Sequence, residues 1–589
     1  MTTATTSAKK GGAWLIEETP PGDVLTPAKL TDEHRMMAET SVAFLTGEVL
    51  PVLDRLEQKD WTLARELVRQ CGELGLIATD VPERFGGLDL DKTAAVVVAE
   101  GIGRSASFAT TFGGQTGLAI MPLLMYGTEA QKAKYLPGLA SGESVGAYAL
   151  SESGSGSDAL SVRTRATRQP DGSYRLNGEK MWITNGGFAD VIIVFAKIDG
   201  EQFSAFIVER GFPGVSSGKE EHKMGLHGSS TTPIILQDAE VPADNLLGEA
   251  GKGHKVAFNV LNYGRFKLAA MCGGGAKAVI GEAARYASER RQFGKPIASF
   301  GAIRHKLGEM VAQTYGIESM LYRTVGLIDD ALAGAGDGGT PHEGEPLRAA
   351  LEEYAIESSI LKVAASEWLD YILDENVQIH GGNGFVKDYP AERHYRDARV
   401  NRIFEGTNEI NRLLIPGMLV RRALKGGLAI IPAARRLQDE LLAPAAAPAG
   451  DGPLADEARA VAAMKKVALM VLGTAMQTCG EKLADEQEVL CFTADILIDA
   501  YAAESCLLRA LQTGDPLAAD AARVITSGAV GRVEAAARQA LAALADGDTL
   551  RTLTAALRRL VKAAPVNTVA LRRRLSDAAL AKSAYPIEK

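Results

Sequence analysis

The spacing of apolar residues changes twice along this chain of 589 residues, and these changes constrain its fold more than any other feature. Residues 30–145 carry apolar residues at three- and four-residue spacing, which is typical of amphipathic helices. From about residue 148, short alternating or apolar runs such as DVIIVFAKI are separated by DG, NG and PG turn signals, as in a small β unit. Helical spacing returns from about residue 252 to 425. We therefore expect helices, then strands, then helices again.

The domain plan follows from this order, because a chain of this length exceeds a single hydrophobic core. Two long helices are predicted in the second helical part, over 254–291 and 348–380, with a Gly-rich connector at 329–346 between them. The low-complexity stretch APAAAPAGDGP at 443–453 marks a linker. The predicted units are a helical domain at 30–146, a β domain at 147–250, a helical domain at 251–428, a linker at 429–453 and a further helical domain at 454–589.

Composition excludes several classes of protein. The formal net charge of −9 argues against nucleic acid as a main partner. The five cysteines form no CxxC pair, which indicates reduced thiols in a cytoplasmic setting. No apolar run reaches the roughly 18 residues of a membrane span, and the first dozen residues, MTTATTSAKKGG, read as a disordered tail without a signal sequence. The eight histidines show no ligand spacing, so no metal is expected.

Two stretches near the start of the β part could hold a cofactor. YALSESGSGSDA at 148–159 offers backbone N–H groups and hydroxyls to a phosphate or a flavin edge, although a flexible surface loop has equal weight. WITN at 182–185 places an indole and a hydroxyl on one face of a strand. Trp182 could pack on a planar cofactor, and a core position is the simpler interpretation of that residue alone.

Three further stretches lie in the second helical part. ERRQFGKPI at 289–297 ends a long helix, where arginines could reach a pyrophosphate or, the simpler interpretation, complement the helix dipole. QIHGGNGF at 378–385 permits close backbone approach to a ligand, although turns also use glycine. In NRIFEGTNEI at 401–410, Glu405 is either an exposed acid at a turn or a base in a dry pocket. No GxGxxG follows a strand and no GxSxG is present.

Taken in order, these motifs resemble the acyl-CoA dehydrogenase family over about residues 30–425. The GGAWLIEE start, the NYGRF segment and the extra C-terminal part are similar to the very-long-chain branch and its bacterial relatives. The resemblance implies a mainly α fold with a central β domain: an N-terminal helical domain, a middle β-barrel, a four-helix bundle and an additional C-terminal helical domain. It also implies FAD between the β domain and the bundle, extended across a subunit interface.

By resemblance, Glu405 is the catalytic base of an FAD-dependent dehydrogenation of long-chain acyl-CoA to trans-2-enoyl-CoA in fatty acid β-oxidation. Ile403 and Phe404 are expected to bury its carboxylate and raise its pKa, and Gly406 to leave room for the thioester. Some relatives carry the base at the position of Gly264, where this chain has no side chain. Electrons are expected to pass to an electron-transferring flavoprotein, and the protein to form a homodimer.

The remaining contacts are carried over residue by residue from the family motifs. Substrate contacts are assigned to Ser157, Arg265 and Gly406, and the cofactor contacts to Tyr148, Leu150, Ser151, Gly156, Ser157, Trp182, Thr184, Arg290, Phe293, Gln378, Gly382 and Thr407. Gly301 and Glu409 depart from positions where relatives carry a glutamine, which puts two cofactor contacts in doubt.

Other functions stay open at this point. An acyl-CoA oxidase would share the residues and differ in the access of oxygen to the flavin. A non-catalytic assembly or DNA-associated protein on the same fold is disfavoured by the retained Glu405 and by the net charge. Residues 551–589 contain nine Lys/Arg and two Asp/Glu. This basic end could touch anionic lipid, although packing against the bundle is favoured.

Overall fold

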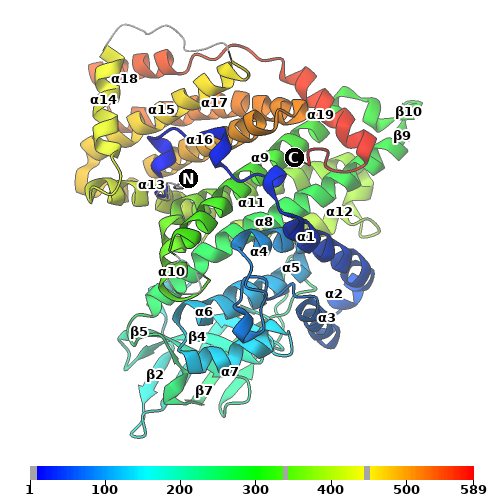
Figure 1. Ribbon diagram of the computed structural model, residues 1–589, viewed down its shortest axis with the longest axis vertical. Helices are drawn as coiled ribbons and strands as arrows, with labels where there is room; N and C mark the ends of the chain where they lie inside the picture. The colour runs from blue at the N-terminus through cyan, green and yellow to red at the C-terminus, as the bar shows by residue number, and fades with distance from the viewer. Residues whose placement is uncertain (1–8, 336–341, 443–451, 589) are drawn as a thin grey trace, which may run out of the picture.

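The structure is a computed structural model that describes residues 9–335, 342–442 and 452–588. Figure 1 shows a sheet at one end of the molecule, long helices crossing its middle, and the C-terminal helices stacked at the other end. The N-terminal helices α4 (Lys92–Ile102), α5 (Ala106–Gly113) and α6 (Met121–Tyr126) lie between the sheet and the long helices. This order of helical, β and helical parts confirms the predicted fold class.

The N-terminal part is helical, as its apolar spacing predicts. Thr31, Asp60, Asp91 and Thr128 start four of its helices, each accepting a hydrogen bond from a backbone N–H of the first turn. A π-helical segment, Gly114–Ile120, separates α5 from α6. The helices are α1 (Asp32–Phe44), α2 (Leu53–Glu57), α3 (Trp61–Glu73), α4 (Lys92–Ile102), α5 (Ala106–Gly113), α6 (Met121–Tyr126) and α7 (Glu129–Ala140).

The middle part is an eight-stranded sheet in the order β6-β7-β3-β2-β4-β5-β8, with β1 parallel to β4. The central strand β4 is buried along almost its whole length, which explains its continuous apolar run. The strands are β1 (Gly146–Ala149), β2 (Arg165–Arg168), β3 (Tyr174–Thr184), β4 (Val191–Ile198), β5 (Gln202–Glu209), β6 (Val215–Ser217), β7 (Thr231–Val241) and β8 (Leu246–Leu247).

Long helices form the second helical part. α8 is a single helix of 37 residues, as predicted, whereas the helix predicted over 348–380 is divided at Tyr354 into α10 and α11. α9 extends six residues into the predicted Gly-rich connector, whose residues 336–341 lie outside the described part. The elements are α8 (Gly253–Glu289), β9 (Arg291–Gln292), β10 (Lys295–Pro296), α9 (Gly301–Gly334), α10 (Gly344–Glu353), α11 (Ala355–His380), α12 (Ala391–Ala398) and α13 (Asn408–Leu424).

The C-terminal helices pack onto this bundle. α16 contacts α9 and α13, and α19 contacts α9. α14 lies inside the predicted linker 429–453, so that range is helical over its first half, while residues 443–451 lie outside the described part. The helices are α14 (Ile430–Leu442), α15 (Ala455–Cys479), α16 (Gln487–Thr513), α17 (Pro516–Leu544), α18 (Gly547–Leu560) and α19 (Thr568–Lys582).

The prediction of a disordered N-terminal tail is wrong for residues 9–12, which are the described part of that range. The backbone N–H groups of Gly11 and Gly12 donate to carboxylates of Glu353 and Glu357, over 2.8 and 2.6 Å. Trp14 follows and packs its ring 5.0 Å from that of Tyr501 on α16. The segment therefore lies across the junction of α10 and α11 and ties it to the C-terminal helices. Residues 1–8 lie outside the described part.

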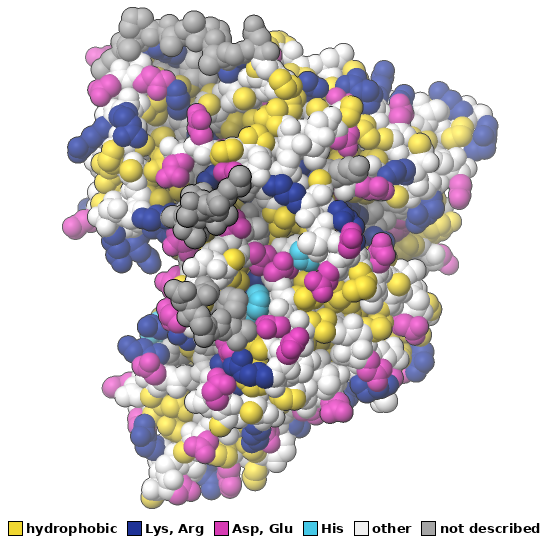
Figure 2. Space-filling model, in the orientation of Figure 1, with side chains coloured by type: hydrophobic (Ala, Val, Ile, Leu, Met, Phe, Trp, Pro, Cys, Tyr) yellow, Lys and Arg dark blue, Asp and Glu magenta, His cyan; other side chains and the backbone are white. Residues whose placement is uncertain are grey.

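The basic C-terminal end is largely engaged by the fold. Arg572 pairs with Glu309 of α9 over 2.6 Å, and Arg574 pairs with Asp520 of α17 over 2.6 Å. These contacts support packing against the bundle over a lipid-facing role. On the face shown in Figure 2, basic and acidic side chains are interspersed, with no single broad patch of either sign.

Two described helical stretches, Asp32–Glu57 and Ala455–Asp485, are long and apolar enough to cross a membrane by length and composition. Neither stretch is an uninterrupted apolar run, because both contain charged residues. The finding is weak evidence for a span, because core helices of soluble proteins meet the same criteria and half of the second stretch is buried.

Candidate active site

Glu405 lies in a left-handed turn between two helical segments. Its φ is 57° and that of Gly406 is 80°, a pair of values that reverses the chain before Thr407 caps α13. Asn411 holds the turn by donating its side-chain amide to the carbonyl oxygens of Gly406 and Thr407, over 2.9 and 3.0 Å. Gly406 is required there by its backbone conformation, a reason the sequence analysis did not give.

The carboxylate of Glu405 packs against the backbone of Gly264 on α8. A Cβ at position 264 would lie 2.6 to 3.0 Å from the carboxylate atoms, so any side chain there would displace the carboxylate. The position where some relatives carry the base is thus in direct contact with the base here. Only glycine at 264 leaves the space that Glu405 occupies.

The environment of Glu405 raises the pKa of its carboxyl group. Its Oε2 atom is buried and has no hydrogen-bond partner among the described residues. Burial raises the pKa of Glu405 to about 7, and the charges of Arg265 and Lys362 oppose that rise. The expectation that Ile403 buries the carboxylate is wrong, because the Ile403 side chain is 52% exposed, whereas Phe404 does line the adjoining cavity.

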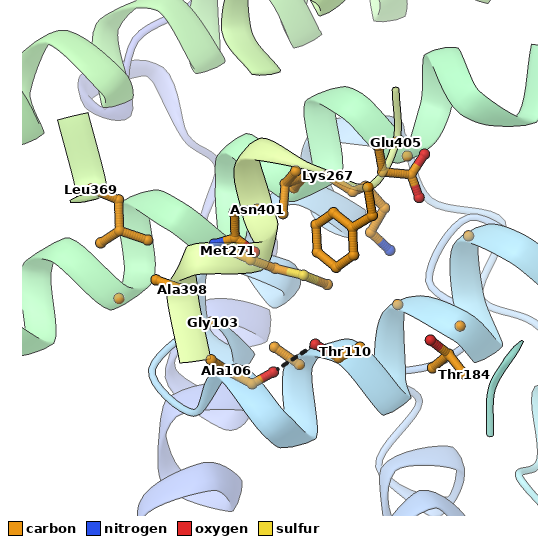
Figure 3. A pocket seen from close by; sticks show the side chains of 18 of the residues that line it. Gly103, Ala106, Thr110, Thr184, Lys267, Met271, Leu369, Ala398, Asn401 and Glu405 are labelled. Atoms are coloured by element: carbon orange, nitrogen blue, oxygen red, sulfur yellow. Dashed lines mark hydrogen bonds between the residues drawn. The ribbon is translucent and has the colours of Figure 1, made fainter. Parts of the chain in front are cut away.

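A cavity of about 110 Å³ extends from Glu405 between the N-terminal helices, α8 and α11. Figure 3 shows Glu405 and Thr184 at one end and Leu369 at the other, with Met271 between them. Nine of the lining residues are glycine or alanine, and the space is elongated with a mostly apolar wall. The small residues that line it are Gly103, Ala106, Ala109, Gly113, Gly114, Gly117, Gly264, Gly275 and Ala398.

The β domain brings three of the expected cofactor residues to this region. The Tyr148 hydroxyl is buried without a hydrogen-bond partner among the described residues, and the charge of Glu405 adds to the burial that raises the pKa of Tyr148. Thr184 lines the cavity. Trp182 is 57% exposed and adopts a φ of 58° where β3 loses its regular register with β7. The core position weighed for this tryptophan is therefore wrong.

Arg265 joins the group from α8. Its guanidinium donates to the carbonyl oxygen of Glu405 over 3.3 Å and to the side chain of Asn262 over 3.0 Å. Its side chain is buried, and it thus helps to hold the turn that carries the base.

Other expected residues lie far from Glu405 in the same chain. Arg290 caps the C-terminus of α8, 25 residues beyond Arg265, which is about 37 Å along the helix. Phe293 follows in the β9–β10 hairpin and is 91% exposed. The end of α11 lies alongside, since the rings of Tyr286 and His380 stack 4.0 Å apart. Gln378 and Gly382, which flank His380, are both exposed.

The loop after β1 carries the remaining expected contacts. Leu150 and Ser151 are half-buried at the edge of the sheet, and their carbonyl oxygens accept hydrogen bonds from Lys180 Nζ and from the backbone N–H of Met181. Gly156 and Ser157 are exposed further along the loop. Among the described contacts, none links Ser157 to Glu405.

Sequence reasoning missed several buried lysines. Lys180 pairs with Glu152 over 2.6 Å, and Glu152 also accepts hydrogen bonds from the backbone N–H groups of Arg163 and Thr164, which fixes the loop. Lys267 lines the cavity and donates to the Thr116 hydroxyl over 3.1 Å. Lys362 is also buried, and its charge acts on Glu405. A lysine inside an apolar helical run, as in RFKLAAM and ILKVAAS, is the signal that could have identified the last two.

Metal chemistry has no apparent site in the described ranges. No group of three or more His, Cys, Asp or Glu side chains is placed there to hold a metal ion.

Comparisons with known proteins agree with this geometry. Family models described as acyl-CoA dehydrogenase N-terminal, middle and C-terminal domains match residues 31–143, 147–239 and 251–419, and another C-terminal domain model of that name matches 463–559. A probable acyl-CoA dehydrogenase of Bacillus subtilis is 47% identical over 96% of each chain. The human mitochondrial very long-chain specific acyl-CoA dehydrogenase is 40% identical over 62% of this chain and 53% of its own.

A solved structure extends the similarity to the whole fold. The acyl-CoA dehydrogenase of Bacillus anthracis, crystallised with FAD, superposes with a TM-score of 0.96 at 46% identity and covers 98% of this chain and 100% of its own. The three-part fold and a buried acid beside a long apolar cavity define a dehydrogenase-type architecture. This chain belongs to the acyl-CoA dehydrogenase family.

Proposed function

We propose that this protein is an FAD-dependent dehydrogenase of long-chain acyl-CoA and that Glu405 is its catalytic base. One observation carries the proposal: a buried carboxylate oxygen without a partner lies in the wall of a long apolar cavity. A carboxylate held at a pKa of about 7 is a far stronger base than one in water. The cavity supplies the apolar space for an acyl chain.

The residues of this chain fit FAD. An indole that is 57% exposed at a strained backbone position suits contact with a planar ring system, and Trp182 provides it. The unpartnered hydroxyl of Tyr148 offers a hydrogen bond from the same side. The exposed Phe293 and the glycines after α11 suit a long cofactor that reaches from one subunit onto another.

In the proposed reaction, Glu405 Oε2 takes the proton from the α-carbon of the acyl thioester. The backbone N–H of Glu405, which has no acceptor among the described residues, is free to donate to the thioester oxygen as negative charge develops there. FAD, when bound, supplies the acceptor for the hydride that leaves the β-carbon. Arg265 and Asn411 hold the turn in place, and the surrounding apolar wall excludes water. The product is a trans-2-enoyl-CoA.

The proposed oligomeric state, electron acceptor, location and substrate contacts rest on family membership and on exposed side chains. We infer a homodimer, because Phe293 and Phe385 are 91% and 86% exposed and lie in the two segments expected to meet a second subunit. An electron-transferring flavoprotein is the proposed electron acceptor, and the cytoplasm the proposed location. Ser157, Arg265 and Gly406 remain the proposed substrate contacts, and Thr407 a proposed cofactor contact.

An anaerobic titration with palmitoyl-CoA tests the proposal. Bleaching of the flavin absorbance is expected, because α,β-dehydrogenation reduces the bound cofactor. A yellow protein that no straight-chain or branched acyl-CoA bleaches would contradict the proposal. A bleached enzyme that air reoxidises within the turnover time would indicate an oxidase.

Glu405→Gln provides the test of the base. The amide keeps the shape of the side chain and cannot accept the proton, so flavin reduction should slow by roughly 10²- to 10⁴-fold while FAD stays bound. Reduction at the wild-type rate in this variant would show that another group is the base.

A further inference from the structure

Charged and titratable groups face Glu405 from three elements, and none of them forms an ion pair with its carboxylate. Arg265 faces it from α8, Lys362 from α11 and Tyr148 from β1. Arg265 donates to the backbone carbonyl of Glu405 and to neighbouring side chains. Lys362 is fully buried, and its ammonium donates elsewhere. The base therefore keeps a free lone pair beside two positive charges.

A single amide directs the Lys362 ammonium. Lys362 Nζ donates to Asn408 Oδ1 over 2.6 Å, and Asn408 Nδ2 donates to Ser366 Oγ over 3.1 Å and to Glu367 Oε1 over 2.9 Å. The orientation of the amide follows from chemistry, because an ammonium only donates and a carboxylate only accepts. Asn408 lies three residues after Glu405, at the first position of α13.

The next interaction in this series of hydrogen bonds is the Glu367–Arg412 ion pair, which holds Asn408 in place. Glu367 receives a bidentate pair from Arg412, with distances of 2.6 and 2.8 Å to its two oxygens. Asn408 and Arg412 are four residues apart on α13 and therefore share one face of that helix. Glu367 thus meets both side chains from α11, which locks the two helices together one turn beyond the base.

The last hydrogen bond of the series joins Arg412 to the additional C-terminal domain. The Nε atom of Arg412 donates to Asp495 Oδ1 of α16 over 2.7 Å. Arg412 is 17% exposed, and it is held from both sides by carboxylates. The path from Asp495 to Lys362 contains direct hydrogen bonds only. The two carboxylates of the path are partly exposed, at 40% for Asp495 and 35% for Glu367, whereas Asn408 and Lys362 near the base are buried.

We propose that the C-terminal domain positions the charge environment of the base: Asp495 holds Arg412, Arg412 holds Glu367, and Glu367 with Asn408 holds the Lys362 ammonium beside Glu405 without bonding to it. The inference rests on the proposed function, since it assigns Lys362 as a positioning residue for that base. It gives the additional domain a part in catalysis as well as in packing.

The arrangement serves two requirements of a carboxylate base. A buried carboxylate needs nearby positive charge to ionise at all, and both Lys362 and Arg265 oppose the rise in the pKa of Glu405. A direct ion pair would occupy the lone pair that must take the substrate proton. Asn408 accepts the hydrogen bond of the Lys362 ammonium in place of Glu405. The positive charge of Lys362 therefore still stabilises the ionised carboxylate, and Oε2 stays free to take the proton.

The test compares pH profiles of flavin reduction by palmitoyl-CoA, in single turnover, for the full-length FAD-bound protein. The rising limb of the pH–rate profile has its midpoint at the pKa of Glu405. Lys362→Met should move this limb to higher pH by about one unit, because the ionised carboxylate loses a neighbouring positive charge. Lys362→Arg should restore most of that shift. Asp495→Asn should move the limb in the same direction by a smaller amount, because it loosens Arg412 and leaves Lys362 charged.

Asp499→Asn is the matched control. Asp499 lies one turn further along α16 and also pairs with an arginine, Arg532 of α17, over 2.6 Å, and its described hydrogen bonds include none to Arg412. Its profile should coincide with that of the wild type. Equal shifts in Asp495→Asn and Asp499→Asn, or none in Asp495→Asn, would overturn the role of the C-terminal domain. A wild-type limb in Lys362→Met would overturn the role of Lys362.

A second readout separates this inference from the proposed function. The infrared band of the protonated carboxyl group that Glu405→Gln removes can be titrated without substrate. Its midpoint should shift upward in Lys362→Met, or in Lys362→Gln if the methionine variant fails to fold. If the wild type is not bleached by any acyl-CoA, the proposed function fails and this titration still decides the role of Lys362. An unchanged midpoint overturns that role.

Discussion

The absence of a side chain at Gly264 determines where the carboxylate of Glu405 can lie. The carboxylate of Glu405 occupies the space that a Cβ at this position would need. The sequence identified both residues through family motifs, yet their direct contact depends on the packing of α13's leading turn onto α8. The exposure of Ile403 and the strained backbone of Trp182 could not be predicted either, because turn geometry, not composition, sets both.

Gly264→Ala should displace Glu405 and leave the fold intact. The added methyl group would lie 2.6 to 3.0 Å from the carboxylate atoms, so the base must move, and a shift of about 1 Å can cost roughly 100-fold in the rate of flavin reduction. Gly273→Ala is the control, because its Cβ would meet Ile317 at an ordinary 3.6 Å on the same helix. Equal rates in the two variants would contradict the contact.

The pH dependence of the wild type follows from the raised pKa of Glu405. Burial disfavours the carboxylate, so the base is protonated below about pH 7 and ionised above it. The rate of flavin reduction should therefore rise with pH through about 7. Stopped-flow measurements between pH 5.5 and 9 check this. A profile that is flat down to pH 5.5 would mean an ordinary carboxyl pKa.

At the scale of elements, periodicity predicted the helices well and their interruptions poorly. α8 was predicted almost to its ends because its apolar face is continuous. The break at Tyr354 has no sequence signal, since helix-forming residues continue through it. The N-terminal segment fixes the break instead, by donating to Glu353 and Glu357 on either side. The predicted linker over 429–453 rests on the Ala/Pro-rich composition of 443–453, and that composition gives no indication of α14 beside it.

Ala106 and Ala109 of α5 line the cavity, and a larger side chain there would reduce the space for the acyl chain of the proposed substrate. Ala109→Leu adds three carbon atoms to the wall of a cavity of about 110 Å³. We expect kcat/KM for palmitoyl-CoA to fall by roughly tenfold or more and that for butyryl-CoA to change little, because a short chain does not reach the wall at that depth. Steady-state kinetics with both substrates measure the ratio. Equal losses for both would place Ala109 outside the chain-binding path.

At the scale of the whole molecule, the domain order was predictable and the connections between the domains were not. A buried charge network joins four helices from three of the predicted domains. Glu318 of α9 pairs with Lys277 of α8 and with Arg509 of α16, and Lys277 also pairs with Glu100 of α4. These residues lie more than 400 positions apart at the extremes, so no local pattern could have indicated their contact.

Glu318→Gln should lower the free energy of unfolding of the whole protein, because it leaves Arg509 and Lys277 buried with one carboxylate fewer between them. Breaking a buried pair costs about 3–5 kcal/mol. Burial alone would raise the pKa of Glu318, but Arg509 and Lys277 outweigh it and hold that pKa below its ordinary value. The stabilisation is therefore present above the unfolded pKa of about 4.5 and is lost as pH falls through the lower folded pKa.

Chemical denaturation at pH 7.5 and pH 4, followed by circular dichroism, measures both effects. The difference between the wild type and Glu318→Gln should be large at pH 7.5 and smaller at pH 4, because the unfolded wild-type chain takes up a proton at Glu318 there while its folded pKa is lower. Glu534→Gln is the control, since the Glu534–Arg538 pair on α17 is exposed and contributes about 0.5 kcal/mol or less. A loss in Glu318→Gln no greater than in this control would show that the network does not join the domains energetically.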